Sequence, residues 1–159
     1  MHTVRTTIAL VASVIFAALA APVAAPRAAP QILVTLDPDT ARLVTSDIQD
    51  FWRVFDGAPL TNVAALAAAF QRGYLDPGSP GLRDFLRFRI DTARALAQAV
   101  AARPRYYAAI RATTLALDTD PTIKAAVRQT YHRLKALSPD AVFPDVYFLV
   151  GRLSTGGTA

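Results

Sequence analysis

The sequence contains no cysteine and no glutamate, and its only histidine beyond residue 2 is His132. Without cysteine, the chain can form no disulfide framework, iron–sulfur centre or thiol nucleophile. Without glutamate it has no His-Glu-x-x-His metalloprotease helix, and one histidine is too few for a histidine-rich zinc site. We therefore expect no catalytic, cofactor-binding or metal-ligating residues in this chain, no tight zinc binding and no peptide hydrolysis.

All 12 acidic residues are aspartates, and 17 lysines and arginines leave a net charge of +5. The cationic side chains are densest between residues 83 and 94. Because Arg83, Arg87 and Arg94 are four and seven residues apart, they can share one face of a helix. A solvated helix face is the preferred interpretation, and an anion-binding site is the alternative.

Residues 1–25 have the pattern of a signal peptide. A short basic start, Met1–Arg5, is followed by uncharged residues 6–21, a run shorter than the roughly 20 apolar residues of a membrane-spanning helix. Ala18-Leu19-Ala20 matches the small-residue cleavage form, and we expect cleavage between residues 20 and 29. The chain is then exported to the periplasm or secreted, touches the membrane only transiently and has no nucleic-acid partner. The alternative is an uncleaved anchor in the inner membrane.

The remainder divides into two parts. Residues 26–37 comprise the end of an Ala/Pro linker and a short β-favouring run, QILVTL at 31–36. Residues 38–159 are predicted to form a helical domain that ends in an incomplete sheet. The fold class is therefore mainly α, with about five helices in a bundle-like array, a short N-terminal strand and a C-terminal strand or incomplete hairpin.

Apolar spacing and capping signals predict helices over residues 46–57, 62–73, roughly 80–102, 104–117 and 121–137. Ser46 and Gln49 have the spacing of a capping box at the first helix, and Gly73 is expected to end the second. The third helix is expected to be continuous and the longest. Trp52, on the apolar stripe of the first helix, is expected to be buried against the third.

Residues 146–150, VYFLV, are apolar at successive positions, which predicts a strand buried on both faces. Residues 154–157 resemble a hairpin turn. Because the only other β-favouring run is 32–36, we expect it to be the sole intramolecular partner of this strand. Two strands make a marginal sheet, so we expect residues 146–152 to fray or self-associate and to exchange amide protons faster than residues 82–100.

Several residues with chemical potential have a simpler structural explanation. We expect His132 to be a surface or hydrogen-bonded histidine. Asp118 and Asp120 lack the spacing of a calcium loop, and helix capping explains Asp120. Of the pair Tyr106-Tyr107, one is expected to pack inward rather than stack on a ligand. Gly156-Gly157 lacks the following helix that a phosphate-binding loop requires.

The order of several local motifs resembles that of one family of bacterial exported proteins. The motifs are FW at 51–52, YLDPGSPGLRDF at 74–85, RYYAAIR at 105–111, FPDVYFLVGR at 143–152 and STGGT at 154–158. They are similar to the N-terminal part of a domain-of-unknown-function family of predicted zinc-dependent proteases. In that family a His-Glu-x-x-His helix follows the glycine-rich turn, and the printed chain ends before it. The resemblance therefore implies a helical N-terminal region and carries no metal ligand or catalytic glutamate onto any residue here.

Two functional hypotheses follow. The first is an exported, helical N-terminal fragment of a metalloprotease-like protein, without catalytic residues of its own, whose partner is a downstream metalloprotease domain. The alternative is a stand-alone periplasmic helical binding or interaction module, with an anion binder using Arg83, Arg87 and Arg94 as a weaker variant.

The signal-peptide assignment makes a prediction about mass. We expect the exported protein to begin between Ala21 and Pro30, because the leader is removed at the small-residue site. Intact-mass measurement of the exported species checks this. A mass that retains residues 1–20 would contradict it and indicate an uncleaved anchor.

Overall fold

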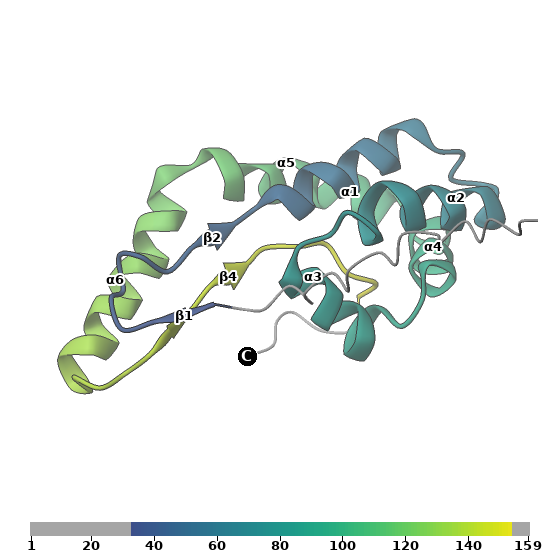
Figure 1. The fold of residues 1–159 in the computed structure, drawn as a ribbon. Helices are drawn as coiled ribbons and strands as arrows, with labels where there is room; N and C mark the ends of the chain where they lie inside the picture. The colour runs from purple at the N-terminus through teal and green to yellow at the C-terminus, as the bar shows by residue number, and fades with distance from the viewer. Residues whose placement is uncertain (1–32, 154–159) are drawn as a thin grey trace, which may run out of the picture.

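The computed structural model describes residues 33–153. The predicted signal peptide and the predicted turn at 154–157 lie outside the described residues. Within them the fold is mainly α, as the sequence predicts, with six α-helices, two single π-helical turns and four two-residue strands (Figure 1). The helices are α1 (Ser46–Gly57), α2 (Val63–Phe70), α3 (Pro80–Phe85), α4 (Ala93–Ala102), α5 (Pro104–Thr119) and α6 (Pro121–Leu137). The π turns are η1 (Gln71–Leu75) and η2 (Leu86–Ile90), and the strands are β1 (Val34–Thr35), β2 (Leu43–Val44), β3 (Phe143–Pro144) and β4 (Val146–Tyr147).

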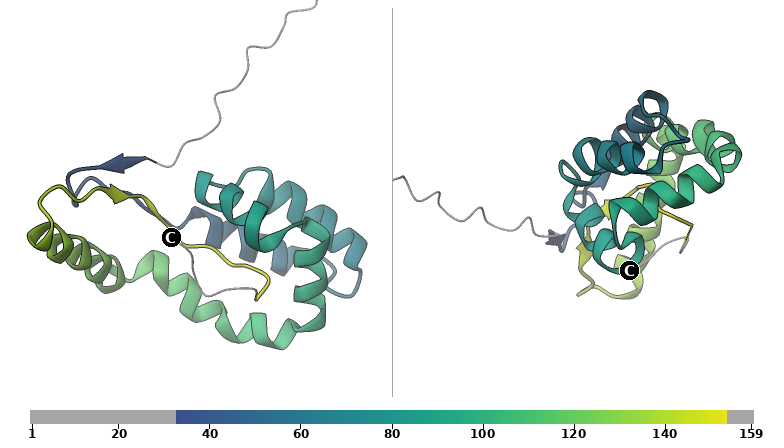
Figure 2. Two further views of the ribbon diagram at one scale, coloured as in Figure 1. Left: turned by 90° about the horizontal axis from the view of Figure 1, so that it is seen from below. Right: turned by 90° about the vertical axis from the view of Figure 1, so that its right-hand side faces the viewer.

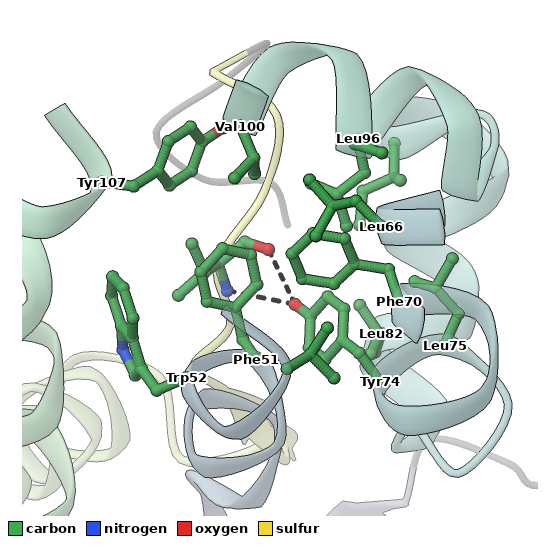
Figure 3. Packing of buried hydrophobic residues seen from close by; sticks show 14 of the residues in the cluster. Phe51, Trp52, Leu66, Phe70, Tyr74, Leu75, Leu82, Leu96, Val100 and Tyr107 are labelled. Atoms are coloured by element: carbon green, nitrogen blue, oxygen red, sulfur yellow. Dashed lines mark hydrogen bonds between the residues drawn. The ribbon is translucent and has the colours of Figure 1, made fainter. Parts of the chain in front are cut away.

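The hydrophobic core lies among α1 to α5 and is centred on Phe51 (Figure 3). The ring centroid of Phe51 is 5.0 Å from that of Trp52, 5.2 Å from that of Phe70, 5.4 Å from that of Tyr74 and 5.8 Å from that of Tyr107. These rings come from four different elements, α1, α2, η1 and α5. Aliphatic side chains complete the core, chiefly Ile48, Leu66, Leu82, Ile90, Leu96 and Val100.

Several helix starts are those that the sequence predicts. Asn62 caps α2 by accepting a hydrogen bond from the Ala65 amide, and Ser79 caps α3 by accepting one from the Leu82 amide. Asp120 caps α6 through the Thr122 amide. A short polar side chain before the first helical turn satisfies amides that have no partner within the helix, which explains all three.

The predicted capping box of α1 is wrong. Thr45, not Ser46, occupies the N-cap position, and its side chain makes no capping hydrogen bond. The Thr45 hydroxyl instead donates to Asp118 Oδ1 at 2.5 Å, and the Gln49 side-chain amide donates to Asp118 Oδ2 at 3.2 Å. A charged acceptor near the end of α5 thus binds the side chains of Thr45 and Gln49, and the predicted capping box of Ser46 and Gln49 does not form.

The continuous third helix, predicted over residues 80–102, is also wrong. It divides into α3, η2 and α4, with a break at Asp91, where φ is 75°. Thr92 then caps α4 by accepting from the Ala95 amide at 3.1 Å. A positive φ at a non-glycine residue interrupts the helix, and a new cap restarts it at a different angle.

Gly73 does not end the second helix, which continues as η1 to Leu75. A Cβ at Gly73 would lie 2.6 Å from Val54 Cγ2 of α1. The absence of a side chain therefore allows close packing of η1 against α1, and the glycine serves tertiary contact rather than helix termination.

Residues 143–148 lie between β1 on one side and β2 on the other (Figure 1). β1 pairs antiparallel with β3, with Val34 opposite Pro144, and β2 pairs parallel with β4, with Leu43 opposite Val146. Of the expected sole partner, residues 32–36, the described strand β1 thus pairs with 143–144 and not with 146–150. The true partner of β4 is the two-residue strand Leu43–Val44, which is too short to show a strand pattern. Of the predicted five-residue strand, only Val146–Tyr147 forms a strand ladder.

α6 extends away from the core and packs against the segment between β1 and β2, and against β3. None of its side chains is buried. Arg128 Nη1 donates to the carbonyls of Pro38 and Ala41 at 2.5 and 2.8 Å, and the Tyr131 hydroxyl donates to the Pro144 carbonyl at 2.8 Å. Polar side-chain contacts with backbone therefore hold this helix more than apolar burial does.

Trp52 is buried, as predicted, with 2% of its surface exposed, but its main partner is α5 and not the third predicted helix. Its indole N–H donates to Thr114 Oγ1 at 2.9 Å. We expect Trp52→Ala to lower the free energy of unfolding by about 3–5 kcal/mol, because it leaves a cavity beside Phe51. Chemical denaturation measures this, with Phe88→Ala as the control, since Phe88 is 72% exposed. Equal effects of the two substitutions would contradict the packing described.

Candidate functional site

The segment that follows β4 is held by side chains rather than by a neighbouring strand. Val150 is buried at the centre of the helical region, and both of its backbone polar groups contact one side chain. The Tyr74 hydroxyl donates to the Val150 carbonyl at 2.7 Å and accepts from the Val150 amide at 3.2 Å (Figure 3). One phenol thus does what a paired residue of an adjacent strand would do.

Two further hydrogen bonds hold the residues that follow Val150. The Tyr107 hydroxyl of α5 donates to the Gly151 carbonyl at 3.0 Å, and Arg152 Nε donates to the Arg89 carbonyl of η2 at 2.9 Å. In the left view of Figure 2, the yellow segment that follows β4 runs in among the helices of the core. We call the contacts of Tyr74, Tyr107 and the Arg89 carbonyl with residues 150–152 the tyrosine clamp.

The close packing of the clamp depends on a glycine. A Cβ at Gly151 would lie 2.9 Å from Phe85 Cε1, so a larger residue would require the Phe85 ring to move. Phe85 ends α3 directly before η2. Both π turns therefore take part in the clamp, η1 through Tyr74 and η2 through Arg89. A π turn shifts the side chains that follow it around the helix axis, which is one reason why such turns recur at functional sites.

A buried carboxylate supports the clamp from α1. Asp47 is 1% exposed and accepts from the Ser79 amide at 3.0 Å and from the Ser79 hydroxyl at 2.5 Å. The Ser79 hydroxyl oxygen in turn accepts from the Leu82 amide in the first turn of α3. This chain of hydrogen bonds fixes α3, and with it Phe85, relative to α1.

Asp145 anchors the other end of the extended segment. It accepts from the Arg42 backbone amide at 2.8 Å, from Arg42 Nε at 2.9 Å and from Arg42 Nη2 at 2.6 Å. Burial acts to raise the pKa of Asp145, but the hydrogen bonds and charge of Arg42 outweigh it and hold that pKa below its ordinary value. Beside this pair lies a shallow pocket of about 210 Å³, lined by Leu33, Val34, Thr35, Thr40, Arg42 and Asp145.

The clamp tyrosines remain protonated at neutral pH. Burial raises the pKa of Tyr74 far above its ordinary value, and the charge of Asp47 adds to this effect. Burial, followed by the nearby Tyr106, raises the pKa of Tyr107 to about 12, against a weaker lowering effect of Arg103. Both hydroxyls therefore stay hydrogen-bond donors, suited to holding backbone and not to acid–base catalysis near neutral pH.

The structure places the residues that the sequence singled out in separate regions. His132 Nε2 is 2.9 Å from Asp39 Oδ1 at the surface of α6. Asp118 binds Thr45, Gln49 and Lys124, and the first of these hydrogen bonds does most to lower its pKa. Tyr107 packs inward while Tyr106 is 46% exposed, as expected for that pair. Gly156-Gly157 lies outside the described part of the chain.

The proposed grouping of Arg83, Arg87 and Arg94 is wrong. Arg83 lies in α3, Arg87 in η2 and Arg94 in α4, and the break at Asp91 separates the last from the others. The four- and seven-residue spacing places side chains together only on one uninterrupted helix. The geometric argument for an anion site at these three residues is therefore lost.

Sequence reasoning missed the polar members of the site. Tyr74 belongs to a motif of the resemblance, but no pattern in the sequence predicts which backbone its hydroxyl contacts. A signal did exist for Asp47, which lies four residues before Phe51 and seven before Val54, and so shares their buried face. A lone aspartate on an apolar stripe indicates a buried partner elsewhere in the fold.

No protein-family model, curated protein or solved structure matches this chain. Within residues 33–153, no three histidine, cysteine or acidic side chains lie together in a way that could hold a metal ion. No helix in this same range is long and apolar enough to cross a bilayer.

The clamp predicts a specific effect of one hydroxyl. We expect Tyr74→Phe to destabilise the protein by about 1–3 kcal/mol, because it leaves the buried amide and carbonyl of Val150 without a partner. The Val150 amide should also exchange faster with solvent, which hydrogen-exchange NMR measures. Tyr106→Phe is the matched control, since that ring is largely exposed. Unchanged exchange at Val150 in Tyr74→Phe would show that the segment is held by other contacts.

The raised tyrosine pKa values predict alkaline instability. The native state holds the phenol protons of Tyr74 and Tyr107 above the ordinary pKa of 10.0, where the unfolded chain releases them. The stability that these two tyrosines contribute is therefore fully present below about pH 10 and is lost as the pH rises further. The pKa values of Tyr131 and Tyr147 are raised as well and act in the same direction. Thermal unfolding from about pH 8 to about pH 11.5 checks this, and Tyr74→Phe should show a shallower decline than Tyr106→Phe.

Proposed function

We propose that this chain is the exported, helical N-terminal part of a metalloprotease-like protein, and that its role is to hold the segment 148–152 in a fixed position for the metal-bearing part. The observation that carries this proposal is the double hydrogen bond between Tyr74 and Val150. The two fully buried tyrosines at the centre of the core bind the backbone of this segment through their hydroxyls. Such an arrangement suits a support better than a ligand site.

A second observation favours the same proposal. The motifs that carry the family resemblance coincide with the parts of the clamp. Residues 74–85 contain Tyr74, Ser79 and Phe85, residues 105–111 contain Tyr107, and residues 143–152 contain the clamped segment. Motifs that are far apart in the sequence thus meet at one place in the fold, as expected if they were kept together for one structural purpose.

In this proposal the chain itself contributes no metal ligand and no catalytic base. Its residues act by position: Asp145 and Arg42 orient the start of the extended segment, and Tyr74 and Tyr107 fix its later part. Preorganisation of this kind matters because a catalytic group that is misplaced by about 1 Å can lose roughly a hundredfold in rate. We place this supporting role in the periplasm, after export of the chain.

The cheapest decisive experiment is to read the DNA that follows codon 159 in all three frames. We expect a His-Glu-x-x-His codon pattern soon after the glycine-rich turn, either in frame or after a frameshift. The protein encoded by the repaired, longer frame should bind one zinc ion after dialysis and show chelator-sensitive proteolysis, whereas the 159-residue chain should do neither. No such pattern in any frame, or zinc bound by the short chain, would contradict the proposal.

A stand-alone periplasmic binding or interaction module is the alternative. The observation in its favour is the set of exposed apolar side chains around β1, where Val34 and Leu36 are 63% and 62% exposed. Absence of the metalloprotease pattern in the flanking DNA would make this the preferred function.

A further inference from the structure

β1 has one paired edge and one open edge. On the paired edge, the Asp145 amide donates to the Leu33 carbonyl, and Thr35 lies opposite Phe143. Val34 lies opposite Pro144, which has no amide proton, so this is the non-hydrogen-bonded type of antiparallel pair. The amide and carbonyl of Val34 therefore point away from β3, and no partner for them exists among the described residues. Leu36 follows directly after β1, and its backbone groups likewise have no hydrogen-bond partner among the described residues.

The open edge carries none of the features that normally prevent strand association. Residues 33–36, LVTL, contain no charge and no proline. Leu33, Val34 and Leu36 are 54%, 63% and 62% exposed, and Val142, the residue before β3, is 54% exposed. Natural edge strands are usually protected by lysine, proline, a bulge or a covering loop. An unprotected, apolar edge of this kind is an interaction surface.

We propose that the open edge of β1 pairs antiparallel with the same edge of a second copy of this chain. If Thr35 lies opposite Thr35 of the partner subunit, Val34 lies opposite Leu36 of the partner subunit. By the same symmetry, Leu36 lies opposite Val34 of the partner subunit. Each of these pairs exchanges two hydrogen bonds, so all four outward groups of each chain find a partner. The contact is two-fold symmetric and closed.

The second copy is favoured over an unrelated extended peptide because the edge is complementary to itself. The two-fold arrangement places apolar side chains beside apolar side chains and brings no like charges together. Pro30 and Pro38 lie four residues before Val34 and four after it, and each lacks the amide that a longer ladder would need. The pairing is therefore confined to the short segment between them. It joins the two-stranded β1–β3 sheets of the two copies into one sheet of four strands, which is closer to the usual sheet size.

Disulfide trapping tests the register directly, since the chain has no cysteine of its own. A non-hydrogen-bonded pair brings its Cα atoms to about 4.5 Å, which is within disulfide range. We expect the Thr35→Cys protein, purified in full from the exported fraction, to form a covalent dimer rapidly under mild oxidation. Phe88→Cys is the control, because Phe88 is 72% exposed and lies in η2, far along the chain from β1. Equal rates of dimer formation in the two variants would overturn the proposal.

Sedimentation equilibrium gives an independent answer if the cysteine variant folds poorly. Val34→Pro removes one outward amide from each chain and no hydrogen bond within the chain. We expect it to weaken dimerisation at least about tenfold while the melting temperature of the monomer stays unchanged. Phe88→Ala should dimerise like the wild type. A wild-type chain that stays monomeric at every concentration, or a Val34→Pro chain that dimerises equally well, would overturn the proposal.

Discussion

The structure depends on the hydrogen bonds between the Tyr74 hydroxyl and the backbone of Val150. Without them, an amide and a carbonyl would lie unpaired in the most deeply buried part of the protein. Their presence lets an extended segment cross a helical core with no neighbouring strand beyond Tyr147. The surrounding features follow from this requirement: Gly73 brings η1 against α1, Gly151 admits the Phe85 ring, and Tyr107 closes the far side.

The polar contacts inside this fold are few, and each joins elements that are distant in the sequence. Asp47 connects α1 to the start of α3, Asp118 connects the end of α5 to the start of α1, and Asp145 connects the extended segment to β2 through Arg42. In the described region no buried side-chain nitrogen or oxygen lacks a hydrogen-bond partner. Because an unpaired buried polar group is costly, such contacts specify one arrangement of helices that apolar packing alone would allow to slide.

The clamp and the open edge of β1 lie near opposite ends of the extended segment 143–152 and serve opposite purposes. The clamp encloses residues 150–152 within one chain, whereas β1, which flanks β3 at the start of the segment, leaves backbone groups available to another chain. The proposed support of a metal-bearing part and the proposed two-fold contact are therefore compatible, since they use different ends of the segment.

The sequence by itself determined the mainly helical fold, the burial of Trp52 and the starts of the helices near residues 62, 80 and 121, because spacing and caps are local properties. It also indicated that one of Tyr106 and Tyr107 would pack inward. Only the tertiary structure decided that the helix predicted over 80–102 breaks at Asp91, that Leu43–Val44 pairs with β4, and that Thr45 and Gln49 bind Asp118 instead of capping α1. The reason is that each of these depends on a partner from 69 to 103 residues away or on packing against other helices, and a local pattern contains no information about which distant group supplies it.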